Sequence, residues 1–574
     1  MEIFTFSFCS SRRIHKLVRH SHSISRHSRV LSLLAMYINE YKNSFFVDIL
    51  EFCNIVKIEE KLPDAVEVER LSINESKNIF SKHDITNSDV EKTEDGSIAE
   101  SEDPFDPFFV QWNGDDDPDN PQNWSNFKKV LIMIEIMLLT CITYMGASIY
   151  SIGQSSIQET FGVGQVVATL NLSLYALGYG IGPVIFSPFS EVAMVGRQVI
   201  YTLTFFVFTM FQIGAATVQN IGGLIVLRFL TGIVCSPALA TGGATVGDII
   251  TPKNLPLCLS IWDLGPTFAP IIGPLLGASM MVAKNWRWIF WFMTWISGFT
   301  LITMIFLFPE TSPDNILYRR AKRLRKQTGD NRYYTKQERI DSQIKISDFL
   351  VRTLYKPFKI IVQEPIVLVF NIYLSLAYGA FYLFFEAFPL VFNGIYNFSP
   401  IETGLSYMGF AVGSLICFPL LYLFLTKVLN PRIENNTATP ETFLILAMWV
   451  GWALPASLFI FGWGAGVHWM LPIASEVLFQ LCVWSLFQVT FTYLGSCYPR
   501  HMASVYAGNG LFRAVFACSF PLFATAMYNN LGSEKYPVGW GSSIIGFFSI
   551  ALAFVPFVLY KYGAVLRSKS KYSG

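Results

Sequence analysis

The sequence from Leu224 to Gly277 decides the fold. It reads LIVLRFLTGIVCSPALATGGATVGD and, after a short polar break at 251–254, LPLCLSIWDLGPTFAPIIGPLLG. Each part is apolar and long enough to cross a bilayer, which takes about 20 residues. Arg228 lies one turn inside the first part, and a charge at that depth usually marks a transport path or a paired partner. We therefore predict two membrane-spanning helices, one of which carries a functional or paired arginine.

The second part of this stretch carries two rows of residues at a spacing of four. The small-residue row is Gly265, Ala269, Gly273 and Gly277. The adjacent row is Pro266, Pro270 and Pro274. Residues four apart share one helix face, and a face without side chains lets another helix come very close. The prolines bend the helix, so the two rows together predict a moving part of a transporter. Leucine in place of Gly273 should prevent a neighbouring helix from sliding on this face, whereas alanine should be tolerated because Ala269 already holds a methyl group.

The composition is that of a membrane protein. Of the 574 residues, 52% are hydrophobic and only 14% are charged, against roughly 25% charged in a typical soluble domain. The nine cysteines form no CxxC pair, so neither a disulfide framework nor a metal site is expected. A phosphate-binding GxxxxGK[ST] loop is absent from the sequence, and no motif indicates an enzyme or a nucleic-acid partner.

The region before the first span is polar. Residues 1–35 contain many Ser, Arg and His; they fit a transit peptide, an unstructured tail, or an over-extended start with Met36 as the initiator. Residues 54–104 are rich in acids and poor in aromatics, so we expect the whole region 1–108 to be disordered. The sequence FVQWNGDDDPDNPQNW at 109–124 lacks the spacing of a calcium loop and is interpreted as a structured lead-in to the first span.

Twelve apolar runs predict an all-α polytopic protein. They are 129–149, 166–188, 199–217, 224–246, 257–282, 288–308, 364–389, 404–426, 441–463, 469–493, 504–527 and 540–562. They form two six-helix halves, 109–308 and 364–562, joined by the polar loop 309–363 and followed by a tail at 563–574. Lys and Arg gather on one side, in this loop, the tail and the neighbouring short loops, so both termini and the loop are predicted to be cytoplasmic.

Two six-helix halves joined by a cytoplasmic loop are the plan of the major facilitator superfamily. The sequence GYGIGPVIFSPFSE at 178–191, followed by Gly196 and Arg197, resembles the superfamily's loop between spans two and three, although Ser187 and Glu191 replace its Gly and Asp and two extra residues precede Gly196. Arg228 with Gly232 resembles the fourth-span motif RxxxG. The run from Gly265 to Pro274 resembles the antiporter motif GxxxGPxxGG, with Ala269 and Pro274 in place of glycines.

Four further segments resemble the fungal twelve-span drug:proton antiporters, in particular the benomyl/methotrexate and azole multidrug-resistance transporters. They are WNGDDDPDNPQNW, LYRRAKRLR, YLFFEAFP and RSKSKYSG. This resemblance covers residue 109 to the end. It implies the twelve-span fold, a monomer in the plasma membrane, and export of amphipathic drugs driven by a proton gradient without a cofactor.

The resemblance also implies roles for charged residues. Arg228 would be a proton-coupling residue that biases a nearby acid; the alternative is a structural ion pair. Asp248 is a second candidate, or a solvated acid at a helix end. It lies twenty residues after Arg228, about 30 Å along a helix, too far for a direct pair. Glu191, Gly196 and Arg197 would form a gating latch on the cytoplasmic side.

A carboxylate among aromatic residues, Glu386, is the third proton-coupling candidate. It could take up a proton, hold a cationic drug, or simply lie at the outer mouth of span seven. We expect Trp262, Tyr378, Tyr382 and Phe385 to line a broad apolar drug pocket. Buried polar candidates of lower rank are Glu135, Asp263, Glu476 and Arg513.

The predicted function is proton-driven export of amphipathic drugs. The alternative is a superfamily importer or symporter of a small nutrient, such as a polyamine or an amino acid. A third hypothesis is a membrane sensor that does not transport, but the tail and the central loop are short for a signalling domain.

Overall fold

The structure is a computed structural model that describes residues 36–38, 40–60, 106, 108–251, 254–343 and 355–572. Within these residues, twelve helical segments are long and apolar enough to cross a membrane. Each overlaps one predicted run, so the prediction of a twelve-span all-α membrane protein is confirmed. The segments begin and end within a few residues of the predicted runs, except that the first, eighth and twelfth extend further at one end.

The first six spans form one half of the bundle. Their helices are α5 (Asn126–Ser148) with α6 (Gln154–Phe161), α7 (Gln165–Glu191), α8 (Arg197–Thr217), α9 (Ile221–Cys235) with α10 (Pro237–Ala240) and α11 (Gly242–Ile249), α12 (Leu255–Trp262) with α13 (Leu264–Ala283), and α14 (Arg287–Leu307).

The last six spans form the other half. Their helices are α19 (Pro365–Phe388), α20 (Pro400–Ser406) with α21 (Met408–Phe424) and α22 (Asn430–Glu434), α23 (Leu444–Val450) with α24 (Ala453–Gly464), α25 (Met470–Cys497), α26 (Met502–Leu531), and α27 (Gly539–Ala553) with α28 (Val555–Ser568).

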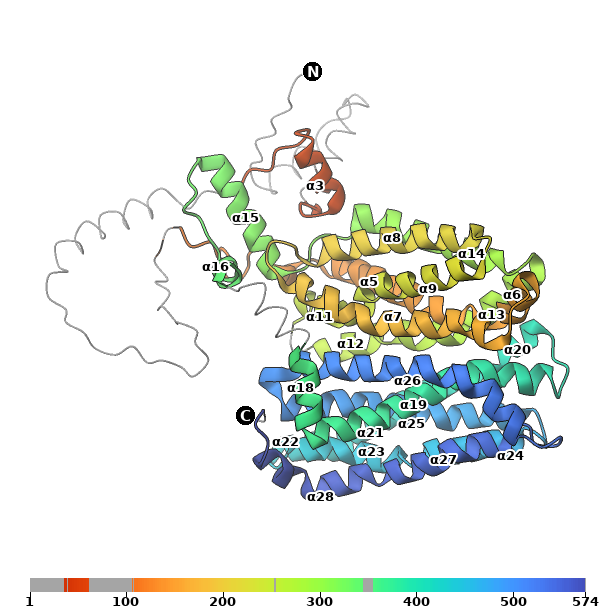
Figure 1. Cartoon of the computed structure of the whole chain (residues 1–574). Helices are drawn as coiled ribbons and strands as arrows, with labels where there is room; N and C mark the ends of the chain where they lie inside the picture. Colours follow the sequence, from red (N-terminus) through yellow and green to blue (C-terminus); the bar gives the residue numbers. More distant parts are fainter. Residues whose placement is uncertain are drawn as a thin grey trace, which may run out of the picture.

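The two halves lie side by side with their spans roughly parallel (Figure 1). Helices α7 and α26 meet along the boundary. The loop between the halves contains α15 (Pro313–Thr328), α16 (Lys336–Gln343) and α18 (Lys356–Gln363). These helices and α3 (Phe45–Phe52) lie at one end of the bundle, which we call the linker end, whereas α6 and α20 lie at the opposite end.

The start of α8 shows how the linker end is built. Gly196 precedes the helix with a φ of 75°, and a Cβ there would lie 2.4 Å from a carboxylate oxygen of Glu310, so only glycine fits. The buried Glu310 carboxylate accepts hydrogen bonds from the amides of Arg197 (3.1 Å) and Gln198 (3.2 Å). An anion at a helix N-terminus is favourable, so Glu310, which follows span six, fixes the start of span three.

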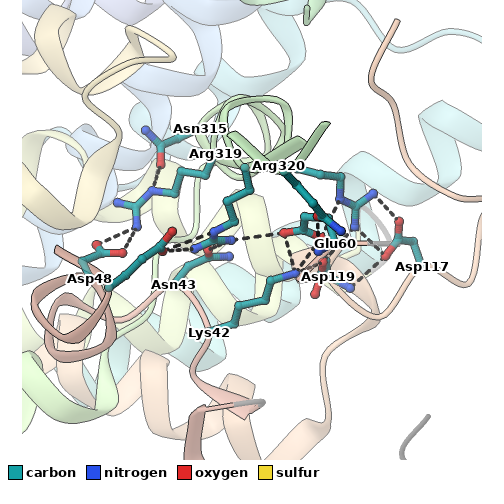
Figure 2. A network of polar contacts seen from close by, with 12 residues as sticks. Lys42, Asn43, Asp48, Glu60, Asp117, Asp119, Asn315, Arg319 and Arg320 are labelled. Atoms are coloured by element: carbon teal, nitrogen blue, oxygen red, sulfur yellow. Dashed lines mark hydrogen bonds and ion pairs between the residues drawn. The ribbon is translucent and has the colours of Figure 1, made fainter. Parts of the chain in front are cut away.

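The N-terminal segment packs on α15 through buried ion pairs (Figure 2). Arg320 donates to Asp117 (2.8 Å) and to Asp119 (2.8 Å). Lys42 pairs with Asp119 (3.0 Å) and with Glu60 (2.8 Å). These contacts join three segments that are far apart in sequence: residues 40–60, the lead-in at 108–124 and the basic helix α15.

Two more arginines of α15 extend this network. Arg323 pairs with Glu51 and Glu60, each at 3.3 Å, and Arg319 pairs with Asp48 at 2.6 Å. The prediction of a disordered region over 1–108 is therefore wrong for residues 40–60, because their acids are the partners of the α15 arginines. Residues 1–35 and 61–105, on which the other N-terminal predictions fall, lie outside the described residues.

The network also sets the pKa of its acids. Burial alone would raise the pKa of Asp119, but Lys42 and Arg320 outweigh burial and lower it to about 2. The pKa of Asp117 is lowered as well, because the hydrogen bonds from Arg320 and from two backbone amides outweigh its burial. A lowered folded-state pKa means that the acid stabilises the fold above its unfolded pKa of about 3.9, and that this stability is lost as the pH falls through about 2.

Replacing Arg320 should destabilise the linker end. The change Arg320→Gln leaves Asp117, which is 3% exposed, without its cation, and we expect a loss of about 3 kcal/mol. The matched control is Lys322→Gln, an exposed residue of the same helix, with an expected change below about 0.5 kcal/mol. The measurement is the thermal unfolding temperature of the purified wild type and variants at a series of pH values from neutral to acidic. The difference between wild type and Arg320→Gln should shrink below about pH 4; equal unfolding temperatures at neutral pH would contradict the role of the network.

Candidate functional site between the two halves

The small-residue face of α13 lies against α5. A Cβ atom on Gly273 would lie 2.1 Å from Ser148 Oγ, and one on Gly277 would lie 2.4 Å from the carbonyl oxygen of Ile149. The four members of the row, Gly265, Ala269, Gly273 and Gly277, are buried. The close approach predicted from the spacing is present, and the neighbour is the first span.

Helix α13 also touches the other half. Its prolines Pro266, Pro270 and Pro274 are buried, and the helix continues through Pro270 and Pro274. A Cβ atom on Gly404 of α20 would lie 2.8 Å from the Cα of Leu275. Helix α13 therefore lies between α5 of its own half and α20 of the other half, at the end of the bundle opposite the linker.

Arg228 is a buried connection between three helices of the first half. On α9, it donates from Nη1 to the carbonyl of Gly146 in α5 (2.8 Å) and from Nε to that of Asn171 in α7 (3.1 Å). Its guanidinium lies 4.4 Å from the Tyr175 ring centre and 5.3 Å from that of Tyr150. Its Nη2 has no hydrogen-bond partner, and no ion pair of the described residues includes Arg228. Within the described residues, the alternative of a structural ion pair is therefore not found.

The predicted latch at the linker end has different partners from those expected. Arg197 pairs with Asp248, through Nε at 2.6 Å and Nη2 at 3.2 Å. This ion pair joins α8 to the end of α11, so Asp248 is not a freely solvated acid. Glu191 is exposed, and none of the ion pairs in the described part of the chain contains it. Arg197 is therefore paired within its own half, and Glu191 takes no part in this ion pair.

Glu386, near the end of α19, joins the two halves. Its Oε2 accepts hydrogen bonds from Gln165 Nε2 (2.9 Å) and Gln154 Nε2 (3.3 Å), and its Oε1 accepts one from Thr169 Oγ1 (3.3 Å). All three donors belong to α6 and α7 of the first half. The Glu386 side chain is buried at 5% exposure. Three neutral donors therefore satisfy a carboxylate across the boundary between the halves.

The Glu386 carboxylate lies in the wall of a cavity of about 220 Å³ at the opposite end. Phe385 lines the same cavity. Polar side chains from both halves line much of the rest, among them Gln158, Asn393, Thr403 and Thr525. A cavity with one carboxylate, several amides and hydroxyls, and some apolar wall can hold a proton or a small polar molecule between the halves.

The predicted aromatic pocket is only partly assembled. Tyr378 and Tyr382 lie 5.2 Å apart, and Tyr382 lies 5.7 Å from Phe385. The hydroxyls of Tyr378 and Tyr144 are hydrogen-bonded, a second contact between the halves. Trp262 lies elsewhere: its Nε1 donates to Thr140 Oγ1 at 3.3 Å, and it does not line the cavity.

Sequence reasoning did not single out the partners of Glu386. Gln154 and Gln165 lie in the loop between the first two predicted spans, where polar residues are common, and Thr169 lies in the first turn of the second span. Their signal is weak but present, since three glutamines and three serines gather within 151–165, next to apolar spans. Glu310 lies at the start of the polar loop after span six, and its capping of α8 depends on a contact between distant segments.

Two six-span halves that enclose a polar cavity and touch through small residues are the architecture of an alternating-access membrane transporter. The sequence profile of the Major Facilitator Superfamily matches residues 136–521. The crystal structure of a peptide transporter, POT, superposes with a TM-score of 0.53 at 14% identity, over 78% of this chain and 98% of that one. The chain therefore belongs to the Major Facilitator Superfamily.

Similar proteins are also found among fungal transporters. Fluconazole resistance protein 1 of Saccharomyces cerevisiae is 54% identical over 548 residues, which cover 94% of this chain and 100% of that protein. Multidrug transporter FLR1 of Candida glabrata is 53% identical over 559 residues, again 94% and 100% of the two chains. The similarity therefore extends beyond residues 109–574, to which the motifs had limited it, into the N-terminal region.

The stability cost of an alanine substitution in the α13 face should depend on which atom the new methyl group would contact. The structure changes the expectation that Gly273→Ala is mild, because its methyl group would overlap the Ser148 hydroxyl. The second change Ser148→Ala removes that oxygen and should restore stability to within about 1 kcal/mol. Gly277→Ala meets the backbone oxygen of Ile149, which no side-chain change removes, and should cost about 1–3 kcal/mol.

The measurement is transport and thermal unfolding of the two alanine variants, each with and without Ser148→Ala. We expect the second change to rescue Gly273→Ala and to leave Gly277→Ala impaired. Full activity of Gly277→Ala would show that α13 and α5 do not stay in this contact.

Proposed function

We propose that this chain exports amphipathic toxic compounds from the cell in exchange for protons. The drug-related names of its relatives support the substrate class. The position of Glu386 carries the mechanism, because this carboxylate lines the cavity and accepts three hydrogen bonds from the opposite half. No cofactor is required, and the proton gradient supplies the energy.

The proton acts on the contact between the halves. An ionised carboxylate only accepts hydrogen bonds, whereas a protonated one carries a donor and accepts fewer. Proton uptake by Glu386 would therefore weaken its bonds to Gln154, Gln165 and Thr169. Weaker bonds favour separation of α19 from α6 and α7, which opens the cavity on that side. Transfer of the proton from Glu386 toward the cytoplasmic side would restore the three bonds and close the cavity.

The orientation of the protein in the membrane follows from the distribution of its basic residues. The linker end carries the basic helix α15 and the lysines of the C-terminal tail, and positive loops stay in the cytoplasm. Both termini would then be cytoplasmic, and the cavity with Glu386 would face the outside, where protons enter. We propose a monomer in the plasma membrane.

Arg228 supports the Glu386 site from a distance. Its guanidinium packs on Tyr150, whose hydroxyl donates to the carbonyl of Ala168 at 2.8 Å. Thr169, the next residue, donates to Glu386. We therefore assign Arg228 to positioning the outer end of α7; the proton itself would be carried by Glu386. Asp248, paired with Arg197, would hold the first half together at the linker end.

The variant Glu386→Gln tests this function. Glutamine cannot ionise, so it mimics the protonated state without releasing a proton, and drug efflux should fall by at least about tenfold, or ~1.4 kcal/mol. The matched control is Glu135→Gln: Glu135 is also buried in a span, but its hydrogen bond goes to Thr303 of the same half. The measurement is drug accumulation in cells that express each variant, with and without a protonophore, at equal surface levels.

Wild-type cells should accumulate less drug than non-expressing cells, and the protonophore should abolish the difference. Glu135→Gln should behave as wild type. Normal efflux by Glu386→Gln would overturn the role of Glu386, and net drug uptake along the proton gradient would overturn export itself.

A further inference from the structure

The short helix α18 has two apolar faces, of which the protein covers one. Pro357, Ile360 and Ile361 are buried against the bundle, and a Cβ atom on Gly508 of α26 would lie 2.6 Å from the Ile361 side chain. The other face carries Tyr355, Phe358 and Val362, which are 62%, 52% and 80% exposed. An apolar face this exposed, on a helix fixed so firmly, indicates an external partner.

The position of α18 indicates what that partner is. Glu364, with extended backbone angles, separates α18 from the span α19, which begins at Pro365. Figure 1 shows α18 running across the ends of the spans instead of along them. A helix that lies across the start of a span is at the boundary between lipid and water, where an apolar face can enter the headgroup region.

The charges around α18 are basic. The helix itself carries Lys356 and Lys359 and no acid. The C-terminal tail comes next to it, because Tyr572 donates a hydrogen bond to Gln363 Oε1 at 3.0 Å, and this tail carries the exposed Lys569 and Lys571. Lysines that flank an apolar face at the membrane boundary attract anionic headgroups while their aliphatic stems lie along the lipid.

We propose that α18 is a docking surface for anionic phospholipids of the adjacent leaflet. Phe358 and Val362 enter the interface, and Lys356, Lys359 and the tail lysines bind the headgroups. In the orientation of the proposed function this leaflet is the cytoplasmic one, where anionic lipids are concentrated. The bound lipid would hold the second half of the bundle at a fixed depth, directly before span seven, which carries Glu386.

The test compares backbone hydrogen exchange of α18 in lipid nanodiscs of phosphatidylcholine with and without phosphatidylserine. The full-length protein is used as wild type, as Lys356→Gln/Lys359→Gln, and as Lys322→Gln/Lys326→Gln. The last pair is the matched control, since it removes two exposed lysines from α15, which projects away from the spans. The discs carry the lipid in both leaflets and no transport is measured, so the result depends on neither the orientation nor the export function.

In wild type, phosphatidylserine should slow exchange in α18 by at least about tenfold, as expected for several basic residues near an anionic surface. The control should keep this effect and Lys356→Gln/Lys359→Gln should lose most of it. Equal exchange of wild-type α18 in both lipids would overturn the proposal. An unchanged phosphatidylserine effect in Lys356→Gln/Lys359→Gln would overturn it equally.

Discussion

The buried carboxylate of Glu386 is the constraint on which the proposed mechanism depends. A charge inside a membrane protein must find partners, and three of the hydrogen bonds to Glu386 come from the other half. The donors come from α6 and α7 across the cavity, so the requirement to satisfy one acid holds the halves together at one end. In the proposed mechanism the same requirement makes the contact sensitive to a proton, because the need for donors changes when the charge is removed.

Each half moves as a unit only if its own helices are tightly connected. In the first half this connection has three parts: the contact of the α13 glycines with α5, the buried Arg228, and the linker-end contacts of Glu310 and Arg197. All of them lie within that half. Between the halves, α7 packs along α26 and Gly404 approaches α13. The polar contacts across this boundary include Glu386, the Tyr144–Tyr378 hydroxyl pair and the hydrogen bond from Trp484 to Asp263. In the proposed transport cycle, tight packing within each half favours rigid-body rocking of one half against the other.

Much of the fold could be predicted from the sequence, because apolar runs of bilayer length appear directly in the order of residues. The α13 face was also predictable, since a spacing of four defines a helix face, although the identity of α5 as its neighbour was not. The partner of Arg197 could not be predicted, because Asp248 and Glu191 are both acids near the same end and only packing distinguishes them. The network around Arg320 joins residues about two hundred positions apart, such as Asp117 and Arg320. Residues 40–60 were included in the expected disordered tail because the segments on either side of them are polar.

The central claim, that Glu386 holds the opposite end closed, can be measured as a distance. Spin labels on the exposed residues Glu159 of α6 and Leu405 of α20 report the separation of the halves at that end. In wild type, a short distance should dominate at neutral pH, and a longer one should gain population as the pH falls. In Glu386→Gln the longer distance should be populated at every pH. Identical, pH-dependent distance distributions in the two proteins would contradict the claim.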